Sequence, residues 1–350
     1  MEFEPLGGDE FAPTQTYLNT STCGLLPRRA VAAVTALAAE LAAGRPGGSG
    51  DDEAVAAARA SYARIVGVDP DRVATGGSVA VHVGLIAQSL PAGAEVLFPE
   101  GEFSSVIDPF LVRGDLKLRY VPLERIADSV GADTALVALS SVQSADGRTA
   151  DLAAVRAAAA AHGARTLVDA TQSAGWLPLR AGDFDYTVSG GFKYLICPRG
   201  VSFLTVTEEA QESLTPIHAG MAASADPWGS VYGPLAELAR SALRFDEPPA
   251  YLSYHGAAAS LALLEEIGIE RVHAHGTALA ARFRAGLERI GHPAVPDTSV
   301  VVAVPGLGDR HADLLRAGVV TAARAGNLRA SFHLYNTDAD VDRALDVLSA

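Results

Sequence analysis

Residues 163–206 read GARTLVDATQSAGWLPLRAGDFDYTVSGGFKYLICPRGVSFLTV, and the architecture of the chain can be worked out from this stretch. It contains three short apolar runs, at 166–170, 186–189 and 201–206, each bounded by glycine, proline or acidic turn residues. Continuous apolar runs of this length are typical of strands that are covered on both faces. Asp169 lies near the end of the first run, and Lys193 lies just beyond the second. Because open parallel sheets bind ligands at the carboxyl ends of their strands, these two side chains are predicted to share a site.

Lysine is rare in this chain, which draws attention to Lys193. The 27 basic residues are 25 arginines and two lysines, Lys117 and Lys193. A guanidinium stays protonated, whereas a desolvated lysine amine can lose its proton and attack a carbonyl. Lys193 and Asp169 suit pyridoxal phosphate, whose aldehyde forms a Schiff base with an amine and whose ring nitrogen needs a carboxylate. The alternative is that Lys193 is a surface lysine and Asp169 a helix cap.

The motif LVDATQSAG…FDYTVSGGFKYLICPRG closely resembles the cofactor signature of the class V aminotransferases, a family that includes cysteine desulfurases and kynureninase. The resemblance implies that Asp169, Gln172 and Lys193 bind pyridoxal 5′-phosphate, with Gln172 donating to its ring hydroxyl. The family often has a histidine or tyrosine before the lysine, which helps to hold the phosphate. Phe192 stands there and has no polar atom, so Ser189 is considered as a substitute.

The same resemblance implies further cofactor ligands. A Gly-Gly-Ser turn leads into a predicted helix, and free amides at a helix start bind anions. Gly77, Ser78 and Val79 are therefore expected to bind the phosphate, although an ordinary capped helix start has the same pattern. Phe103 stands where the family stacks an aromatic or imidazole ring on the cofactor; the alternative is an aromatic residue of the core. Ser141 stands where the family often has an asparagine beside the ring hydroxyl.

Three residues are expected to bind an amino-acid-like substrate. The segment NLRASFHLYNT at 327–337 resembles the family's carboxylate-binding strand, so Arg329 is expected to grip the substrate carboxylate as a planar fork. The alternative is an ordinary charge on a surface strand. Asn19 lies in a segment that enters the active site in the family, unless it belongs to a simple strand-to-helix turn. Gln143 is a further substrate-side donor.

Resemblance also implies a homodimer with shared active sites, because sites of this family lie at the subunit interface. The segment 244–249 reads RFDEPP, where the family has a threonine that reaches the phosphate of the other subunit; here a proline replaces it. The loop 218–232 carries histidine, tryptophan and tyrosine together and is a weaker pocket candidate, either in this subunit or toward the partner.

Alternating strands and helices, together with the resemblance, predict an α/β protein of fold-type I. We expect an N-terminal arm at 1–16 and a large cofactor-binding domain at 17–250, built on a mostly parallel seven-stranded sheet that is sandwiched by helices. A smaller α+β domain is expected at 251–350. Further strands are predicted at 94–99, 116–123, 134–139, 299–304 and 327–333. Helices are predicted at 27–43, 52–66, 151–162, 252–266 and 270–290, with a Gly/Pro loop at 44–50.

Composition narrows the class of protein. Of the 350 residues, 49% are hydrophobic, which is enough for a substantial core, and the net charge of −14 argues against nucleic-acid binding. Two cysteines cannot form a disulfide framework and suit a reducing cytoplasm. The acidic N-terminus lacks the apolar region of a signal peptide, and no apolar run is long enough to span a membrane. No metal site is predicted.

The cofactor alone leaves several reactions open. Desulfurases of the family carry a nucleophilic cysteine shortly before the carboxylate arginine, but residues 319–326 contain none. We therefore expect a lyase that eliminates a side-chain leaving group, with Lys193 taking the Cα proton. The overall pattern resembles C–S lyases of the hercynylcysteine sulfoxide lyase type. An aminotransferase or a racemase is the alternative, and a desulfurase or a non-catalytic homologue is less favoured.

Overall fold

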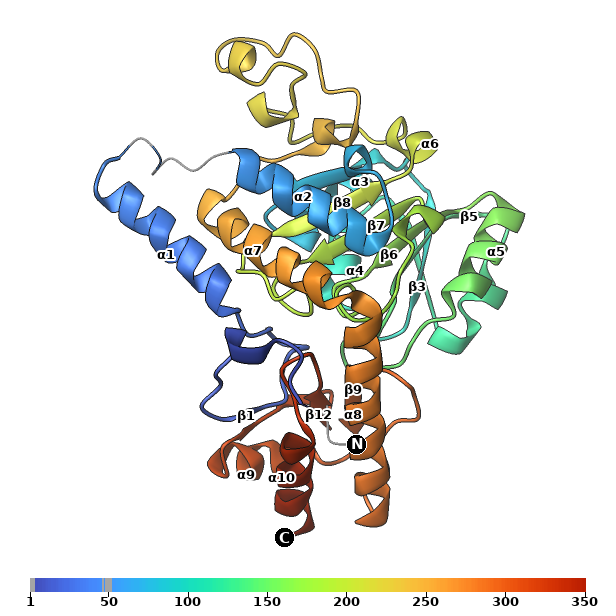
Figure 1. Cartoon of the computed structure of the whole chain (residues 1–350). Helices are drawn as coiled ribbons and strands as arrows, with labels where there is room; N and C mark the ends of the chain where they lie inside the picture. Colours follow the sequence, from blue (N-terminus) through green and yellow to red (C-terminus); the bar gives the residue numbers. More distant parts are fainter. Residues whose placement is uncertain (1–3, 46, 48–51) are drawn as a thin grey trace.

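A seven-stranded sheet forms the centre of the larger part of the molecule in the computed structural model, which describes residues 4–45, 47 and 52–350 (Figure 1). The Gly/Pro loop predicted at 44–50 lies mostly outside the described residues. The strand order is β2-β8-β7-β6-β5-β3-β4, and only β8 runs antiparallel to its neighbours. The predicted mostly parallel seven-stranded sheet is thus confirmed. Its strands are β2 (Val73–Gly76), β3 (Glu95–Pro99), β4 (Lys117–Val121), β5 (Thr134–Ser140), β6 (Arg165–Asp169), β7 (Tyr186–Gly190) and β8 (Ser202–Val206).

Helices cover both faces of this sheet, because successive strand side chains point to opposite sides. Phe98 and Leu136 pack on one face with α3 (Val79–Ser89) and α4 (Ser104–Leu111). Val137 and Val168 pack on the other face with α5 (Leu152–His162). On that same side, Phe203 of β8 packs with α2 (Asp52–Val66) and α7 (Tyr251–Ile267). The short apolar runs of the sequence are thus buried strands that helices cover on both faces, as their continuous apolar pattern predicted.

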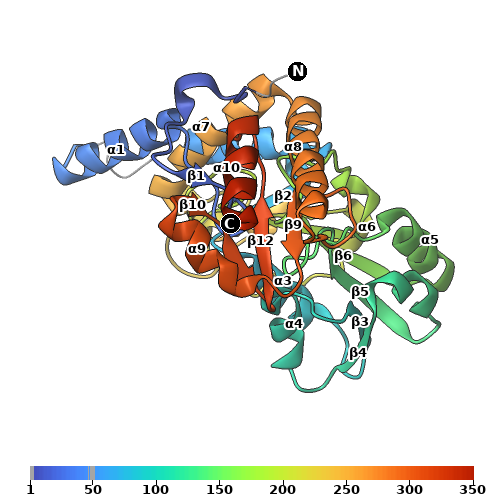
Figure 2. The ribbon, with the colours of Figure 1, turned by 90° about the horizontal axis from the view of Figure 1, so that it is seen from below.

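The C-terminal part is a second, smaller layer around an antiparallel sheet, β11-β12-β9. Figure 2 shows α8, α9 and α10 around these strands. Buried residues of α8 and α10, such as Phe283 and Leu345, pack on β9 and β12. The elements are α8 (Ile269–Arg289), β9 (Val301–Val304), α9 (His311–Arg316), β10 (Val319–Val320), β11 (Ala322–Arg324), β12 (Asn327–Ser331) and α10 (Asp338–Ser349).

The N-terminal segment lies against this C-terminal part. The amide of Leu6 donates to the Leu334 carbonyl (2.7 Å), and β1 (Thr16–Tyr17) pairs in parallel with β10. Salt bridges from Arg28 and Arg29 then tie residues 9 and 10 to the start of α1 (Arg28–Ala42). The division at residues 16 and 250 stays a prediction.

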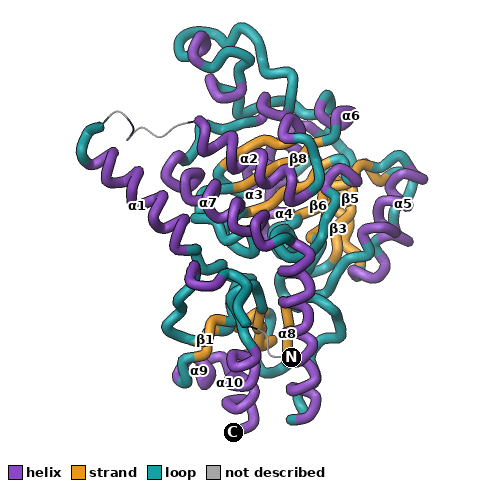
Figure 3. The backbone as a smooth tube through the Cα atoms, viewed as in Figure 1, coloured by secondary structure: helices purple, strands orange, loops and turns teal. Residues whose placement is uncertain are grey.

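Between α6 (Glu208–Gln211) and α7 the chain is mostly loop, with short turns at η7 (Met221–Ala223), η8 (Trp228–Ser230) and η9 (Ala242–Phe245). Figure 3 shows this loop projecting beyond the edge of the sheet. The side chains of Trp228 and Tyr232 are 75% and 92% exposed, and neither lines the cavity described below. A search of the described helices finds none with the length and apolarity needed to cross a bilayer.

Candidate active site

A cavity of about 190 Å³ opens where β2, β5, β6 and β7 end, as the strand-end rule predicts. The structure brings seven of the predicted site residues to its wall: Gly77, Ser78, Val79, Phe103, Asp169, Gln172 and Lys193. Nine residues that were not predicted complete the wall: Ser105, Ser140, Ser144, Thr171, Gly190, Phe192, Arg199, Gly200 and Val201. The roles of these residues toward a ligand stay predictions.

Lys193 lies on the turn after β7 and is buried, with 6% of its surface exposed, so it is not a surface lysine. Its Nζ lies 5.2 Å from the ring centre of Phe103 and 5.7 Å from that of Phe192. Among the described residues, Nζ has no hydrogen-bond or ion-pair partner. Burial lowers the pKa of Lys193 to about 8; the Asp169 carboxylate opposes this shift, and nearby arginines add to it. An amine with this pKa is partly neutral near pH 7.5 and able to attack a carbonyl.

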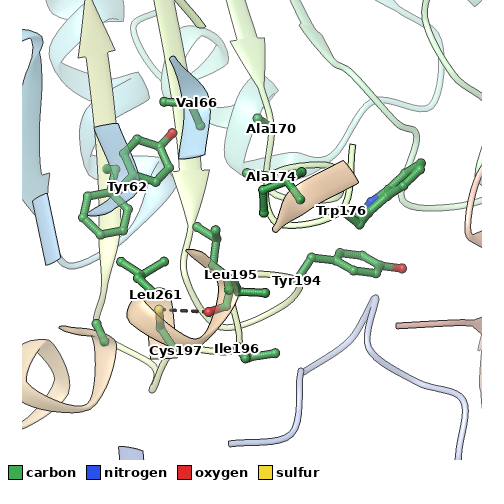
Figure 4. Packing of buried hydrophobic residues seen from close by; sticks show 14 of the residues in the cluster. Tyr62, Val66, Ala170, Ala174, Trp176, Tyr194, Leu195, Ile196, Cys197 and Leu261 are labelled. Carbon is green, nitrogen blue, oxygen red and sulfur yellow. Dashed lines mark hydrogen bonds between the residues drawn. The ribbon is translucent and has the colours of Figure 1, made fainter. Parts of the chain in front are cut away.

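The backbone that carries Lys193 is held on both sides. The Gly24 amide donates to the Phe192 carbonyl (2.9 Å), and the Cys197 amide donates to the Gly191 carbonyl (2.9 Å). A Cβ on Gly24 would lie 2.1 Å from the Lys193 carbonyl oxygen, so only glycine fits there. Leu195, Ile196 and Cys197 then pack into the core below the turn (Figure 4). This close packing fixes the direction in which the amine points.

Asp169 ends β6 and is buried at the floor of the cavity. Burial raises its pKa, while hydrogen bonds from Thr171 and the charge of Lys193 act in the opposite direction. One of those bonds is from the Thr171 amide to Oδ1 (2.8 Å). Gln172 donates from Nε2 to the Ser21 carbonyl and to Ser144 Oγ, and its buried Oε1 has no partner among the described residues. The cavity floor therefore offers a carboxylate and an unsatisfied amide oxygen.

The start of α3 forms another wall. Ser78 is the N-cap residue but makes no side-chain capping bond, so its hydroxyl is not used by the helix. The Gly77 amide donates to Oε2 of Glu247 (2.9 Å). Glu247 belongs to the segment 244–249, in which Asp246 forms a buried salt bridge with Arg59 of α2 (2.6 Å) and accepts the Thr75 amide of β2 (2.7 Å). That segment thus contacts the helix start of its own chain.

Arg329 does not line the cavity itself but contacts Ser144, which does. It is 1% exposed, which rules out a surface-strand charge, and burial lowers its pKa to about 10. Its guanidinium donates to the carbonyl and hydroxyl of Ser144, which lines the cavity, and to Oγ1 of Thr22 (2.8 Å). Its buried Nε has no partner among the described residues. Arg324 donates weakly to the same Thr22 (3.4 Å), so two guanidinium groups meet there.

Besides Arg329, four predicted residues do not line the cavity. Ser189 Oγ is bound to the Tyr62 hydroxyl (2.8 Å) and does not line the cavity, so its role as a substitute phosphate ligand stays a prediction. Gln143 donates to Glu102 (3.0 Å), so its amide is held away and the next residue, Ser144, faces the cavity instead.

The other two of these residues, Ser141 and Asn19, are likewise not part of the wall. Ser141 bonds the Asp169 carbonyl (3.1 Å) and Ser173 (2.6 Å) and so supports the floor from behind. Asn19 accepts the Thr22 and Cys23 amides through its backbone carbonyl, while its buried Oδ1 has no partner among the described residues, so its expected contact with a substrate stays a prediction.

Glu102 is the residue that the sequence reasoning missed most clearly. It is buried and accepts hydrogen bonds from the Phe103 amide (2.7 Å), the Ser140 amide (2.6 Å) and the Gln143 side chain. It therefore positions Phe103, whose ring is 43% exposed and lines the cavity rather than packing in the core. The sequence signal for this role was the position of Glu102, directly before Phe103 and shortly after the buried strand β3. No cluster of three metal-binding side chains occurs in the part of the chain that the structure describes.

This donor set fits pyridoxal phosphate. Lys193 supplies an unpaired amine for the aldehyde, Asp169 a carboxylate for the ring nitrogen, and Phe103 an apolar face for the ring. The orphaned Gln172 Oε1 is a polar atom that needs a ligand or a water molecule. The start of α3 provides amides and a free hydroxyl for a phosphate.

Comparisons with known proteins agree with this fit. Residues 53–344 match the family model for aminotransferase class-V. The chain is 28% identical to the uncharacterized aminotransferase YcbU of Bacillus subtilis over 312 residues, which covers 84% of this chain and 82% of that protein. It is 29% identical to isopenicillin N epimerase of Streptomyces clavuligerus over an alignment of 387 residues, with 97% and 95% covered. The fold matches that of the cystine C-S lyase C-DES with a TM-score of 0.86 at 23% identity, covering 96% and 97% of the two chains.

Proposed function

The chain belongs to the class V aminotransferases, whose cofactor is pyridoxal 5′-phosphate, and from this premise we propose that it is a lyase acting on an amino acid with a leaving group on its side chain. When bound, pyridoxal phosphate supplies an electron sink for the bond that is broken at Cα. The protein's contribution is to bind the substrate, hold the ring nitrogen protonated through Asp169, and move one proton.

The observation that carries this proposal is the number of bases at the cavity. Of the described residues that line it, only Asp169, Lys193 and Arg199 have ionisable side chains. Asp169 lies at the floor, and a guanidinium is a poor base. Lys193 is therefore the group that takes the Cα proton, and its pKa of about 8 suits this role near neutral pH. Elimination of a leaving group requires no second base, and neither does transamination, so the assay below separates these two reactions.

The carboxylate of the substrate is expected at Arg329. Its guanidinium is already oriented by Ser144 and Thr22, so little side-chain freedom is lost on binding. The Nε atom has no partner among the described residues, which leaves a donor for the ligand. A carboxylate placed there would direct the rest of the amino acid toward the amine of Lys193.

The positions of the two cysteines argue against persulfide-forming desulfuration. Cys197 is buried in the core, where it donates to the Leu195 carbonyl (3.2 Å), and burial raises the pKa of its thiol (Figure 4). Cys23 is half-buried and lies in the turn next to Gly24. Neither cysteine lines the cavity. A thiolate placed to attack a substrate sulfur is thus missing from the described wall.

Epimerisation or transamination is the second candidate function, because the relatives include an epimerase and an aminotransferase. Epimerisation must return the proton to the opposite face of Cα. Besides Lys193, the described wall has only Asp169 and Arg199 as ionisable groups, and the Phe103 ring, 5.2 Å from the amine, cannot donate a proton. This geometry favours elimination over a two-base epimerisation.

The test is an assay of the purified enzyme, loaded with cofactor, on a panel of S-substituted cysteines and their sulfoxides. Elimination releases ammonia and a 2-oxo acid without any added amino acceptor. Turnover that requires an added 2-oxo acid would identify an aminotransferase, and loss of optical purity without ammonia would identify an epimerase. Either outcome rejects the lyase. Lys193→Ala should abolish turnover. Lys117→Ala changes the only other lysine of the chain, which lies on exposed β4, and should leave turnover unchanged.

We further propose a homodimer in the cytoplasm. Large exposed side chains support the first part: Val112, Trp228 and Tyr232 are 78%, 75% and 92% exposed, and such surfaces are often covered by a partner. Light scattering coupled to gel filtration measures the mass of the particle. A monomer that retains full activity would reject the dimer.

A further inference from the structure

The cavity wall contains one arginine, Arg199, on the turn between the lysine and β8. Its guanidinium carbon lies 4.3 Å from the ring centre of Phe192, the residue directly before Lys193. Its backbone is fixed by the Ser253 hydroxyl, which donates to the Arg199 carbonyl (2.8 Å). Its guanidinium makes no hydrogen bond or ion pair with any described residue. Arg199 is an exposed residue, so the N–H donors of its guanidinium are accessible to a ligand.

The phosphate of the cofactor needs positive charge that the rest of the wall does not supply. A phosphate monoester carries close to two negative charges at neutral pH. Phe192 has no polar atom, Ser189 is bound to Tyr62, and the segment 244–249 has prolines in place of a hydroxyl. Glu247 adds a negative charge at the Gly77 amide. The free amides of the α3 start and the Ser78 hydroxyl remain, but these groups carry only partial charges.

Arg199 lies where this charge is missing. It shares the cavity wall with Gly77, Ser78 and Val79, so an anion at the helix start is within the same cavity as the guanidinium. Stacking on Phe192 restricts the long side chain and leaves the edge of the guanidinium, with its N–H donors, free. We propose that Arg199, supported by Phe192, binds the phosphate of pyridoxal 5′-phosphate together with the start of α3. Phe192 then acts as the platform for the cation instead of donating a hydrogen bond itself.

The test separates the phosphate from the rest of the cofactor. Cofactor-free full-length protein is titrated with pyridoxal 5′-phosphate and, in parallel, with pyridoxal, which lacks the phosphate, and the Kd is read from the visible absorbance of the bound cofactor. Arg199→Gln should raise the Kd for pyridoxal 5′-phosphate about 10- to 100-fold, as expected for loss of a charge-assisted hydrogen bond. The Kd for pyridoxal should change less than about twofold, because the lost contact involves only the phosphate. Arg199→Lys should recover part of the loss.

Inorganic phosphate provides a second readout. It should compete with pyridoxal 5′-phosphate in the unchanged protein and compete about tenfold more weakly in Arg199→Gln. Arg240→Gln, which changes an arginine whose side chain is 91% exposed and does not line the cavity, is the matched control and should alter neither Kd. Equal losses for both ligands would overturn the proposal, because they would mean that Arg199 only supports the shape of the wall. No loss for either ligand would overturn it as well. These titrations use no substrate, so their outcome is independent of which reaction the enzyme catalyses.

Discussion

Removal of the buried amine should stabilise the cofactor-free protein. Lys193 has a pKa of about 8 in the folded chain and about 10.5 when free, so the folded chain disfavours its charged form. At 1.36 kcal/mol per pH unit, this difference corresponds to about 3 kcal/mol below pH 8. Lys193→Met keeps an unbranched apolar stem in the same place and removes the amine. We therefore expect its free energy of unfolding at pH 7 to exceed that of the unchanged protein by about 3 kcal/mol.

The sign and pH window of this effect follow from linkage. Between pH 8 and 10.5 the unfolded lysine is protonated and the folded one is not, so the unfolded state binds more protons and stability rises with pH. The advantage of Lys193→Met should accordingly shrink to about 2 kcal/mol at pH 9 and below about 1 kcal/mol at pH 10. The same unfavourable energy keeps the amine reactive in the native protein.

Urea denaturation of the cofactor-free proteins at pH 7, 9 and 10 measures these differences. Lys117→Met on exposed β4 is the matched control and should show no such dependence on pH. A variant Lys193→Met that is less stable than the unchanged protein at pH 7 would refute the reasoning. So would an advantage that stays constant from pH 7 to pH 10, because the gain would then come from packing and not from charge.

Three further predictions concern the supports of the site. Gly24→Ala should lower the free energy of unfolding by about 1–3 kcal/mol and speed cofactor loss, because its Cβ would lie 2.1 Å from the Lys193 carbonyl; unchanged urea midpoints would contradict this. Arg329→Lys should raise KM about tenfold or more with a smaller change in kcat, since a planar fork is lost, and an unchanged KM would place the substrate carboxylate elsewhere. Asp246→Asn should cost about 3–5 kcal/mol by leaving Arg59 buried without its partner, as thermal unfolding would reveal. The double replacement Arg59→Met with Asp246→Leu should recover most of that loss, and failure to do so would mean that the pair matters for more than its charges.

Much of the site could be predicted because its signals are local. Asp169 and Lys193 each come at or just after the end of a short apolar run, and a Gly-Gly-Ser turn precedes α3. Because the strands that carry them end at the same edge of the sheet, these residues meet at one cavity. Strand boundaries also fell within a few residues, as in β3 (Glu95–Pro99), which was predicted at 94–99. The family resemblance supplied the cofactor, and the match over residues 53–344 supports it.

Two predicted site residues have hydrogen-bond partners that the sequence did not indicate. Ser189 was considered as a ligand of the cofactor phosphate. In the structure its Oγ is hydrogen-bonded to the Tyr62 hydroxyl of α2 (2.8 Å). Gln143 was assigned to the substrate, yet the carboxylate of Glu102 binds its amide. Neither competitor is near in sequence, so no local pattern could reveal it. Arg199 is a similar case, since the sequence could not show that its guanidinium would stack on Phe192 and form no ion pair with a described residue.

The sequence by itself determined the α/β architecture, the order of strand-end residues and the chemistry of the Lys193 and Asp169 pair. These depend on short-range properties: the length of apolar runs, the turn residues between them and the scarcity of lysine. Only the tertiary structure decided the pKa of the amine, the path from Arg329 through Ser144 to the cavity, and which hydroxyl groups are free. The physical reason is that burial and hydrogen-bond competition are set by segments far apart in the chain, which meet only after the sheet and the C-terminal layer have packed together.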